Sequence, residues 1–304
     1  MLRWAVIAAR RLVRNVAFSL AVVCASTHAR AASWSVKNEP VRLVNGSPVL
    51  ITVKPPVALT SLNGNLLQHS FPFAFDAKTK TWFALAGISL EAAPGKYPLE
   101  LTGETVPAKS RPTPAKVTFT RTVAVARANY PKIELSVEKK FTEPSPEELK
   151  EIDDAQKIKK DYLSRVTPDR EWAGQFSPPA DAAISDVFGT QRVFNGEVKS
   201  SHQGLDFRVG TGTPVAAMND GTVLLARPLY FEGNFIVLDH GQGLLTLYMH
   251  LSEFKVKEGD KVTRGQIIGL SGGSGRATGP HLHVAVRWQG TYLDPATLLK
   301  LPLP

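Results

Sequence analysis

The chain of 304 residues contains a single cysteine, Cys24. This cysteine lies in an N-terminal segment with the pattern of a secretory signal: a basic start, the short apolar run Val16–Val23, and the small-x-small sequence Ala29–Ala31. Cleavage near Ala32 removes the cysteine. The mature chain is then expected to have no disulfide, no thiol nucleophile and no thiolate that holds a metal.

The sequence also lacks a long apolar run. The N-terminal run is too short to span a bilayer, and the bulky Val23 directly before Cys24 does not fit a lipoprotein cleavage site. We therefore predict that residues 1–31 are a signal peptide. The mature protein is expected to be exported to the periplasm, or to the cell wall or extracellular space, with no stable membrane anchor after cleavage.

The C-terminal part has no excess of charge of either sign. The net charge of the chain is +9, but five arginines lie in residues 1–31, and residues 175–304 hold eleven Lys/Arg and eleven Asp/Glu. The basic isoelectric point therefore does not indicate a nucleic-acid partner. A solvated basic surface explains the remaining excess more simply than affinity for an anionic polymer such as a cell wall.

Residues 32–130 show no cluster of ionisable residues and no helical periodicity. Short strand-like runs such as Pro48–Val53 alternate with turn signals. The turn signals are Asn45-Gly46, Asn63-Gly64 and Pro94-Gly95. Such spacing predicts an N-terminal β-sandwich domain of roughly immunoglobulin type, which we interpret as a spacer or adaptor.

A linker over residues 131–172 is predicted to contain one amphipathic helix. Ser145-Pro-Glu-Glu148 has the form of a capping box with proline at the first helical position. Apolar residues follow at three- and four-residue spacing, which predicts a helix over about 146–164. We expect this helix to pack against one of the two domains.

From residue 173 to residue 304 the sequence lacks any helical pattern of useful length. Runs such as Asn234–Asp239 and Leu244–Met249 are separated by glycine-bearing turns. The predicted fold class is therefore mainly β, with a C-terminal domain of nearly all antiparallel sheet over 173–304.

Histidines are concentrated in this C-terminal segment. His281 and His283 flank Leu282 at the start of an apolar, β-branched run, so a strand would place both imidazoles on one face. His202 and Asp206 are four residues apart in a glycine-containing, extended segment, which also places them on one face. One imidazole and one carboxylate, joined by an imidazole of the 281–283 strand, form a set of ligands that suits catalytic zinc. Spacing alone does not decide which histidine of the pair is the ligand.

A zinc ion at such a site lowers the pKa of its bound water and polarises a carbonyl. Hydrolysis still needs a group that accepts and donates protons. The chain has no His-Glu-x-x-His helix to supply a glutamate, so histidine is the natural substitute. His250, at the end of a strand-like run, and the spare member of the 281–283 pair are the candidates.

Three motifs together resemble peptidase family M23, the lysostaphin and LytM type of zinc endopeptidases. They are His202-x-x-x-Asp206, Tyr248-Met-His-Leu251 and Gly279-Pro-His-Leu-His283, and the resemblance covers about 185–296. It implies that one Zn²⁺ per chain binds His202, Asp206 and His283, and that His250 and His281 are the catalytic pair. It also implies that the substrate is the peptide cross-link of peptidoglycan.

Alternatives remain for these residues and for the whole chain. A single histidine on a strand is most often structural, and we interpret His240 in this way. The run Ser271–Gly279 lacks the Gly-Lys-Ser/Thr ending of a phosphate loop, so it is interpreted as a groove wall or a plain loop. Glu258–Ile268 resembles half of a biotinyl or lipoyl carrier but lacks the modified lysine tip. A non-catalytic wall-binding or amidase-activating module with the same fold is the competing function; regulatory partners are unknown.

Overall fold

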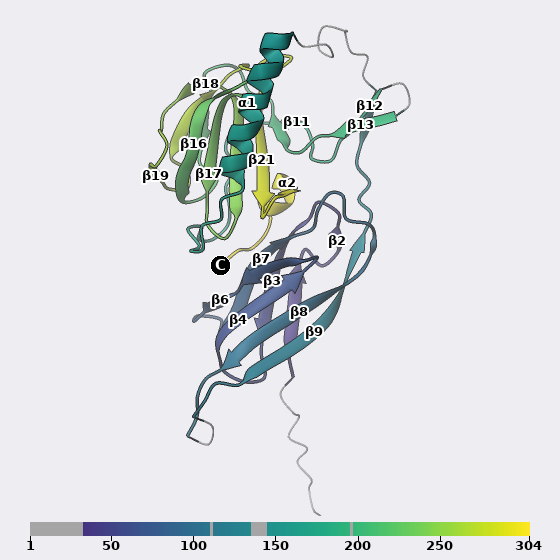
Figure 1. Ribbon diagram of the computed structural model, residues 1–304, viewed down its shortest axis with the longest axis vertical. Helices are drawn as coiled ribbons and strands as arrows, with labels where there is room; N and C mark the ends of the chain where they lie inside the picture. Colours follow the sequence, from purple (N-terminus) through teal and green to yellow (C-terminus); the bar gives the residue numbers. More distant parts are fainter. Residues whose placement is uncertain (1–32, 110–111, 135–144, 195–196) are drawn as a thin grey trace, which may run out of the picture. The chain divides into compact units, whose positions relative to one another are not determined.

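The computed structural model describes residues 33–109, 112–134, 145–194 and 197–304 (Figure 1). The predicted signal peptide lies outside these residues and stays a prediction. Within the described ranges, no helix combines the length and the hydropathy that a membrane crossing requires.

The N-terminal part folds into two β-sheets. One has four strands in the order β1-β3-β7-β6, and the other has five in the order β2-β9-β8-β4-β5. Alternating burial along β4 and β8 shows that each strand turns one face toward the core. The strands of the first sheet are β1 (Ser35–Glu39), β3 (Pro48–Lys54), β6 (Ala74–Asp76) and β7 (Thr81–Gly87). Those of the second are β2 (Leu43–Val44), β4 (Leu59–Leu66), β5 (His69–Pro72), β8 (Gly95–Thr105) and β9 (Lys116–Ala126).

The turn predicted at Asn63-Gly64 is wrong, because both residues lie inside strand β4. A Cβ atom on Gly64 would stand 2.8 Å from Cζ of Phe71 and 2.9 Å from Cε2 of Phe73. The glycine therefore makes room for two aromatic rings rather than for a reversal of the chain. The reversal between β4 and β5 falls at Leu67 and Gln68, both of which have positive φ.

The linker contains helix α1 (Pro146–Leu163), which agrees with the helix predicted over about 146–164. The Ser145 hydroxyl accepts a hydrogen bond from the Glu148 N–H, and the Glu148 carboxylate accepts one from the Ser145 N–H. Ala155 and Leu163 are buried on the face that packs against the C-terminal sheet. At the other end of the helix, the Arg287 guanidinium donates to the carbonyl of Leu163.

The C-terminal part is a ten-stranded sheet with the central order β11-β14-β21-β18-β17-β16-β19. All its strand pairs are antiparallel, as predicted. The strands on the central path are β11 (Ile184–Asp186), β14 (Leu205–Phe207), β16 (Gly221–Leu229), β17 (Gly233–Asp239), β18 (Leu244–Phe254), β19 (Lys261–Val262) and β21 (Leu282–Trp288). Strands β15 (Pro214–Ala216), β20 (Ile267–Ser271) and β22 (Thr291–Leu293) pair beside this path, and the short helix α2 (Pro295–Leu298) follows.

A small third sheet lies beside the C-terminal one in the sequence. Strand β10 (Lys132–Glu134) runs parallel to β12 (Gln191–Phe194), which pairs in antiparallel fashion with β13 (Glu197–Ser201). The linker therefore contributes a strand as well as a helix.

Burial of the central strands sets where polar side chains can lie. Strands β17, β18 and β21 are apolar and buried along most of their length, so the few polar side chains that they carry need partners.

The described residues from Ser33 onward form one compact unit, and the proposed boundaries at residues 130 and 172 stay predictions.

Candidate metal centre and the histidines beside it

The register of strands β14 and β21 brings the three predicted ligands together. Asp206 on β14 lies opposite His283 on β21, and His202 precedes β14 by three residues. One donor atom from each residue, two imidazole nitrogens and one carboxylate oxygen, lies within 4.8 Å of the others. Asp206 Oδ1 is 2.7 Å from His283 Nδ1 and 3.1 Å from His202 Nε2. His202 lies just outside a strand, so its direction is set by contacts and not by the strand alternation assumed above.

Backbone groups fix the orientation of His202. Its Nδ1 donates to the carbonyl of Val187 over 2.9 Å, so the neutral ring carries its lone pair on Nε2, which faces Asp206 and His283. A Cβ atom on Gly204 would overlap the ring of His283. The glycine between His202 and Asp206 is therefore the feature that lets the two strands approach closely enough to join the three ligands.

The charges of this cluster are coupled. Burial by itself would raise the pKa of the Asp206 carboxyl, but hydrogen bonds from His202 and His283 outweigh burial and hold this pKa below its ordinary value. Burial opposes protonation of His202, yet the neighbouring Asp206 raises the pKa of that imidazole. The pKa of His283 is lowered, chiefly because its ring is buried. Asp206 is thus an anion at neutral pH, as a metal ligand must be.

The donor chemistry fits a zinc ion. His202 Nε2 and His283 Nδ1 lie 3.0 Å apart, and both point at the same carboxylate oxygen. Two nitrogens and one oxygen are a ligand set that zinc uses in catalytic sites, whereas calcium and magnesium prefer oxygen alone. The hydrogen bond from His202 Nδ1 to a backbone carbonyl is the support that metal-binding imidazoles commonly have.

His250 and His281, the predicted catalytic pair, lie together beside this cluster. Their ring centroids are 4.7 Å apart, and the ring of His250 is 6.2 Å from that of His283. In each, Nδ1 donates to a backbone carbonyl: His250 to Ser274 over 2.8 Å and His281 to Gly279 over 2.9 Å. Both neutral rings therefore carry the lone pair on Nε2, the position that can accept a proton from a substrate or from water.

His250 has a second constraint, because its backbone has a φ of +62°. Its N–H donates to the carbonyl of Glu232 over 2.8 Å, which satisfies the backbone group where the strand bends. The residue is 8% exposed, and burial lowers the pKa of its imidazole to about 4. His250 is therefore neutral at pH 7.

Sequence reasoning missed three residues that touch this site. Asp186 Oδ2 lies 3.5 Å from His202 Nδ1, the carbonyl of Ser274 holds His250, and the carbonyl of Glu232 holds its backbone. Asp186 ends β11, a strand of only three residues, and the other two act through backbone atoms. Since every residue type has the same backbone carbonyl, the sequence pattern does not predict which carbonyl contacts the histidine.

Other conspicuous residues lie elsewhere. His240 is fully buried, with Nδ1 donating to the carbonyl of Asp220 over 2.6 Å and Nε2 lying 2.7 Å from the hydroxyl of Thr246. Its interpretation as a structural residue agrees with this setting. The hydroxyl of Tyr248 accepts from the N–H of Met218, so this tyrosine belongs to the core.

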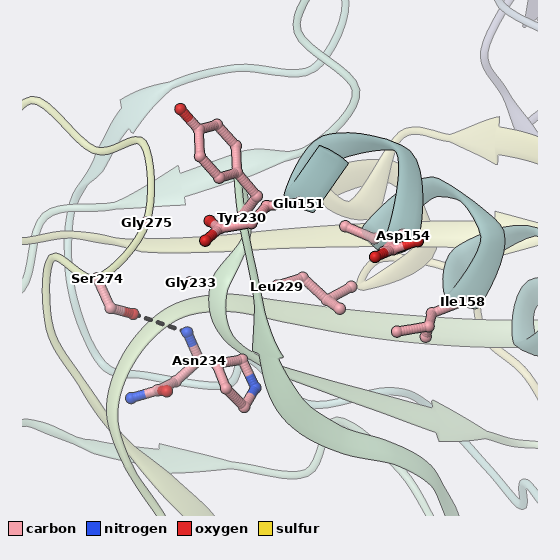
Figure 2. A pocket seen from close by; sticks show the side chains of 11 residues that line it. Glu151, Asp154, Ile158, Leu229, Tyr230, Gly233, Asn234, Ser274 and Gly275 are labelled. Carbon is pink, nitrogen blue, oxygen red and sulfur yellow. Dashed lines mark hydrogen bonds between the residues drawn. The ribbon is translucent and has the colours of Figure 1, made fainter. Parts of the chain in front are cut away.

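A cavity of about 530 Å³ lies between helix α1 and the turn after β16 (Figure 2). Leu229 and Ile158 provide apolar lining, and Glu151 and Asp154 are acidic residues at its helix side. Ser274, whose carbonyl holds His250, also lines this cavity, so the cavity adjoins the predicted catalytic pair without including it.

Comparison with known proteins places this site in a family. Residues 200–295 match the family model for peptidase family M23. The peptidoglycan DD-endopeptidase ShyA of Vibrio cholerae is 46% identical over 103 residues, which are 34% of this chain and 23% of the relative. The DD-carboxypeptidase/endopeptidase Mpg of Neisseria meningitidis serogroup B is 41% identical over 103 residues, again 34% of this chain and 24% of the relative.

The chain spans between 23% and 31% of the length of the first curated relatives that it matches. A crystal structure of a Pseudomonas aeruginosa protein described as an M23 peptidase is 27% identical, with a TM-score of 0.63. The likeness covers 85% of this chain and 95% of that one, so it includes N-terminal sheets as well as the C-terminal sheet.

An antiparallel sheet with this histidine and aspartate cluster defines a protein of the metallopeptidase class. Residues 200–295 form a domain of peptidase family M23.

Proposed function

We propose that this chain is an exported, zinc-dependent endopeptidase that hydrolyses peptide cross-links in peptidoglycan. The observation that carries the proposal is the convergence of His202, Asp206 and His283 within 4.8 Å, with two further imidazoles beside them. The substrate class is supported by the relatives, which are named as peptidoglycan endopeptidases.

In this proposal the three clustered side chains hold one zinc ion. When bound, zinc supplies Lewis-acid chemistry: it activates water and polarises the carbonyl of the scissile peptide. Asp206 contributes the negative charge, and the backbone bond to Val187 keeps the Nε2 lone pair of His202 directed at the ion.

His250 and His281 move the proton. Each holds its Nδ1 proton on a backbone carbonyl, so each can take a proton only at Nε2. One of the two accepts the proton of the attacking water. The other takes a proton from solvent at Nε2 and donates a hydrogen bond from that atom to the oxygen anion that develops on the peptide carbonyl. The first histidine then passes the proton that it took from the water to the leaving amine, which returns this histidine to its neutral form.

The decisive test is digestion of purified sacculi by the zinc-loaded protein, with and without a chelator. We expect the wild type to release peptides and the chelator to abolish this release. The variants His250→Ala and His281→Ala should release no peptides, although their zinc content equals that of the wild type. Mass spectrometry of the products identifies the bond. If sacculi stay intact and His250→Ala leaves the cellular phenotype unchanged, the chain is a non-catalytic wall-binding or amidase-activating module.

Export is a separate part of the proposal. Residues 1–31 have the signal pattern described above. We expect the mature protein in the periplasmic fraction with an N-terminus near Ala32, as determined by N-terminal sequencing. An unprocessed chain that stays in the cytoplasm would refute export without affecting the catalytic proposal.

A further inference from the structure

Two turns meet beside His250. One connects β16 to β17 and leads into Gly233, the first residue of β17; the other follows β20 and contains Ser274 and Gly275. Gly233 and Gly275 have φ values of +63° and +70°. A Cβ atom on Gly233 would overlap Ser274, and one on Gly275 would overlap the backbone of Gly233. The two turns therefore approach so closely that only glycine fits at either position.

The hydroxyl of Ser274 joins these turns to strand β18. It accepts a hydrogen bond from the N–H of Asn234 over 2.8 Å and donates one to the carbonyl of Leu251 over 2.7 Å. The Asn234 side-chain amide donates to the same carbonyl over 3.0 Å. Figure 2 shows the Ser274–Asn234 bond, with Gly233 and Gly275 labelled near it. We call Gly233, Asn234, Ser274 and Gly275 the clasp.

The clasp contacts His250 through the backbone. The carbonyl of Ser274 accepts the Nδ1–H of His250 over 2.8 Å, and the carbonyl of Glu232, next to Gly233, accepts the His250 N–H over 2.8 Å. Leu251, which the Ser274 hydroxyl holds, is the residue directly after His250. Both turns thus fix the imidazole and its unusual backbone conformation at the same time.

We propose that the clasp is the positioning element for His250. By holding the Ser274 carbonyl against Nδ1, it keeps the neutral imidazole in the tautomer that has a proton on Nδ1 and a lone pair on Nε2, and it fixes the ring beside His281 and His283. Ser274 and Gly233 are positioning residues, since they act through His250. The effect on catalysis rests on the proposed function; the effect on the tautomer does not.

The sharpest variant is Gly233→Ala, because a methyl group there displaces the Ser274 carbonyl. Its matched control is Gly265→Ala: Gly265 has a φ of +84°, so it shares the backbone strain, but a Cβ atom on it meets nothing within 4 Å. Ser274→Ala is a milder second variant that removes both hydroxyl hydrogen bonds and keeps the carbonyl.

Each zinc-loaded variant is measured in three ways. Nitrogen-15 NMR of the imidazoles reports the tautomer of His250, metal analysis reports zinc content, and steady-state kinetics on cross-linked muropeptides separate kcat from KM. For Gly233→Ala we expect loss of the Nδ1–H signal of His250 and a fall in kcat of roughly 100-fold, as for a misplaced catalytic group. Ser274→Ala should lower kcat roughly tenfold. Zinc content and KM should match those of Gly265→Ala in both.

Outcomes separate this inference from the proposed function. If Gly233→Ala and Ser274→Ala retain both the His250 signal and the kcat of Gly265→Ala, the clasp does not position His250. Should Gly233→Ala fail to fold, the signal and kcat of Ser274→Ala decide alone. If the wild type cleaves no muropeptide but the signal disappears in Gly233→Ala, the proposed function is wrong and the clasp stands.

Discussion

Asp206 and His283 face each other across two antiparallel strands, and their side chains meet with 2.7 Å between Oδ1 and Nδ1. Strand pairing therefore brings two of the three proposed metal ligands together. The third proposed ligand, His202, lies before strand β14, and its ring is held by a hydrogen bond from Nδ1 to the carbonyl of Val187. The centre is preorganised by the sheet and by one backbone hydrogen bond.

Removal of the carboxylate charge should release zinc. In Asp206→Asn we expect zinc affinity to fall more than roughly 100-fold, because even the loss of a residue that only supports a metal ligand costs about 10–100-fold. Isothermal titration of the metal-free protein measures this. Asp181→Asn, an exposed carboxylate in the preceding segment, is the control and should bind zinc as the wild type does. Unchanged affinity in Asp206→Asn would refute the assigned ligands.

The sequence predicted what depends on side-chain type. Strand-like apolar runs separated by turn signals predicted the β class, and the capping box at Ser145 predicted the start of helix α1. The five site residues could be named because histidine and aspartate in the M23 order are distinctive, and the structure brings them together. Their roles as ligands and catalysts stay predictions.

What depends on backbone geometry could not be predicted. The positive φ of His250 and the carbonyls of Ser274 and Glu232 leave no trace in residue identity. Gly64 is a second example, because Asn-Gly is a strong turn signal and yet no turn forms there. The absence of a Cβ atom on Gly64 instead leaves room for the rings of Phe71 and Phe73, a tertiary contact that the local sequence pattern does not predict.

The role of Gly64 can be tested by adding one methyl group. Gly64→Ala should lower the free energy of unfolding by about 1–3 kcal/mol, the usual cost of overpacking, because the new Cβ collides with the rings of Phe71 and Phe73. Gly95→Ala is the matched strand control, since its Cβ would lie at an ordinary 3.5 Å from the Tyr97 ring. Urea unfolding compares the two. Equal stabilities would show that Gly64 is not needed for the aromatic packing.

Buried His240 should make stability depend on pH. Burial holds the pKa of its imidazole below the ordinary value of about 6.5, so between these two values the unfolded chain binds more protons than the folded one. Its stabilising contribution is complete above about pH 6.5 and is lost as the pH falls below it, with a slope of up to about 1.4 kcal/mol per pH unit.

Urea unfolding of the wild type and His240→Gln, both kept metal-free with a chelator, measures this from pH 5 to pH 8. The chelator removes the separate effect of acid on metal binding. We expect the difference in stability between the two proteins to shrink toward pH 5. A difference that stays constant over this range would mean that His240 takes up no proton on unfolding.

The ion pair between helix α1 and the sheet should hold the helix in place. Lys159 Nζ lies 2.5 Å from Glu232 Oε1, and the two side chains are only 27% and 9% exposed. Lys159→Met leaves the Glu232 carboxylate buried without its cation, and Oε2 of this residue already lacks a hydrogen-bond partner among the described residues. We expect a loss of about 3 kcal/mol in the free energy of unfolding, at the lower end for a broken buried pair.

On the same helix, Lys157→Met breaks pairs that are at least half exposed and should cost under about 1 kcal/mol. The double variant Lys159→Met/Glu232→Met should recover much of the loss, because no unpaired charge is then buried. If Lys159→Met costs no more than Lys157→Met, the pair does not anchor α1.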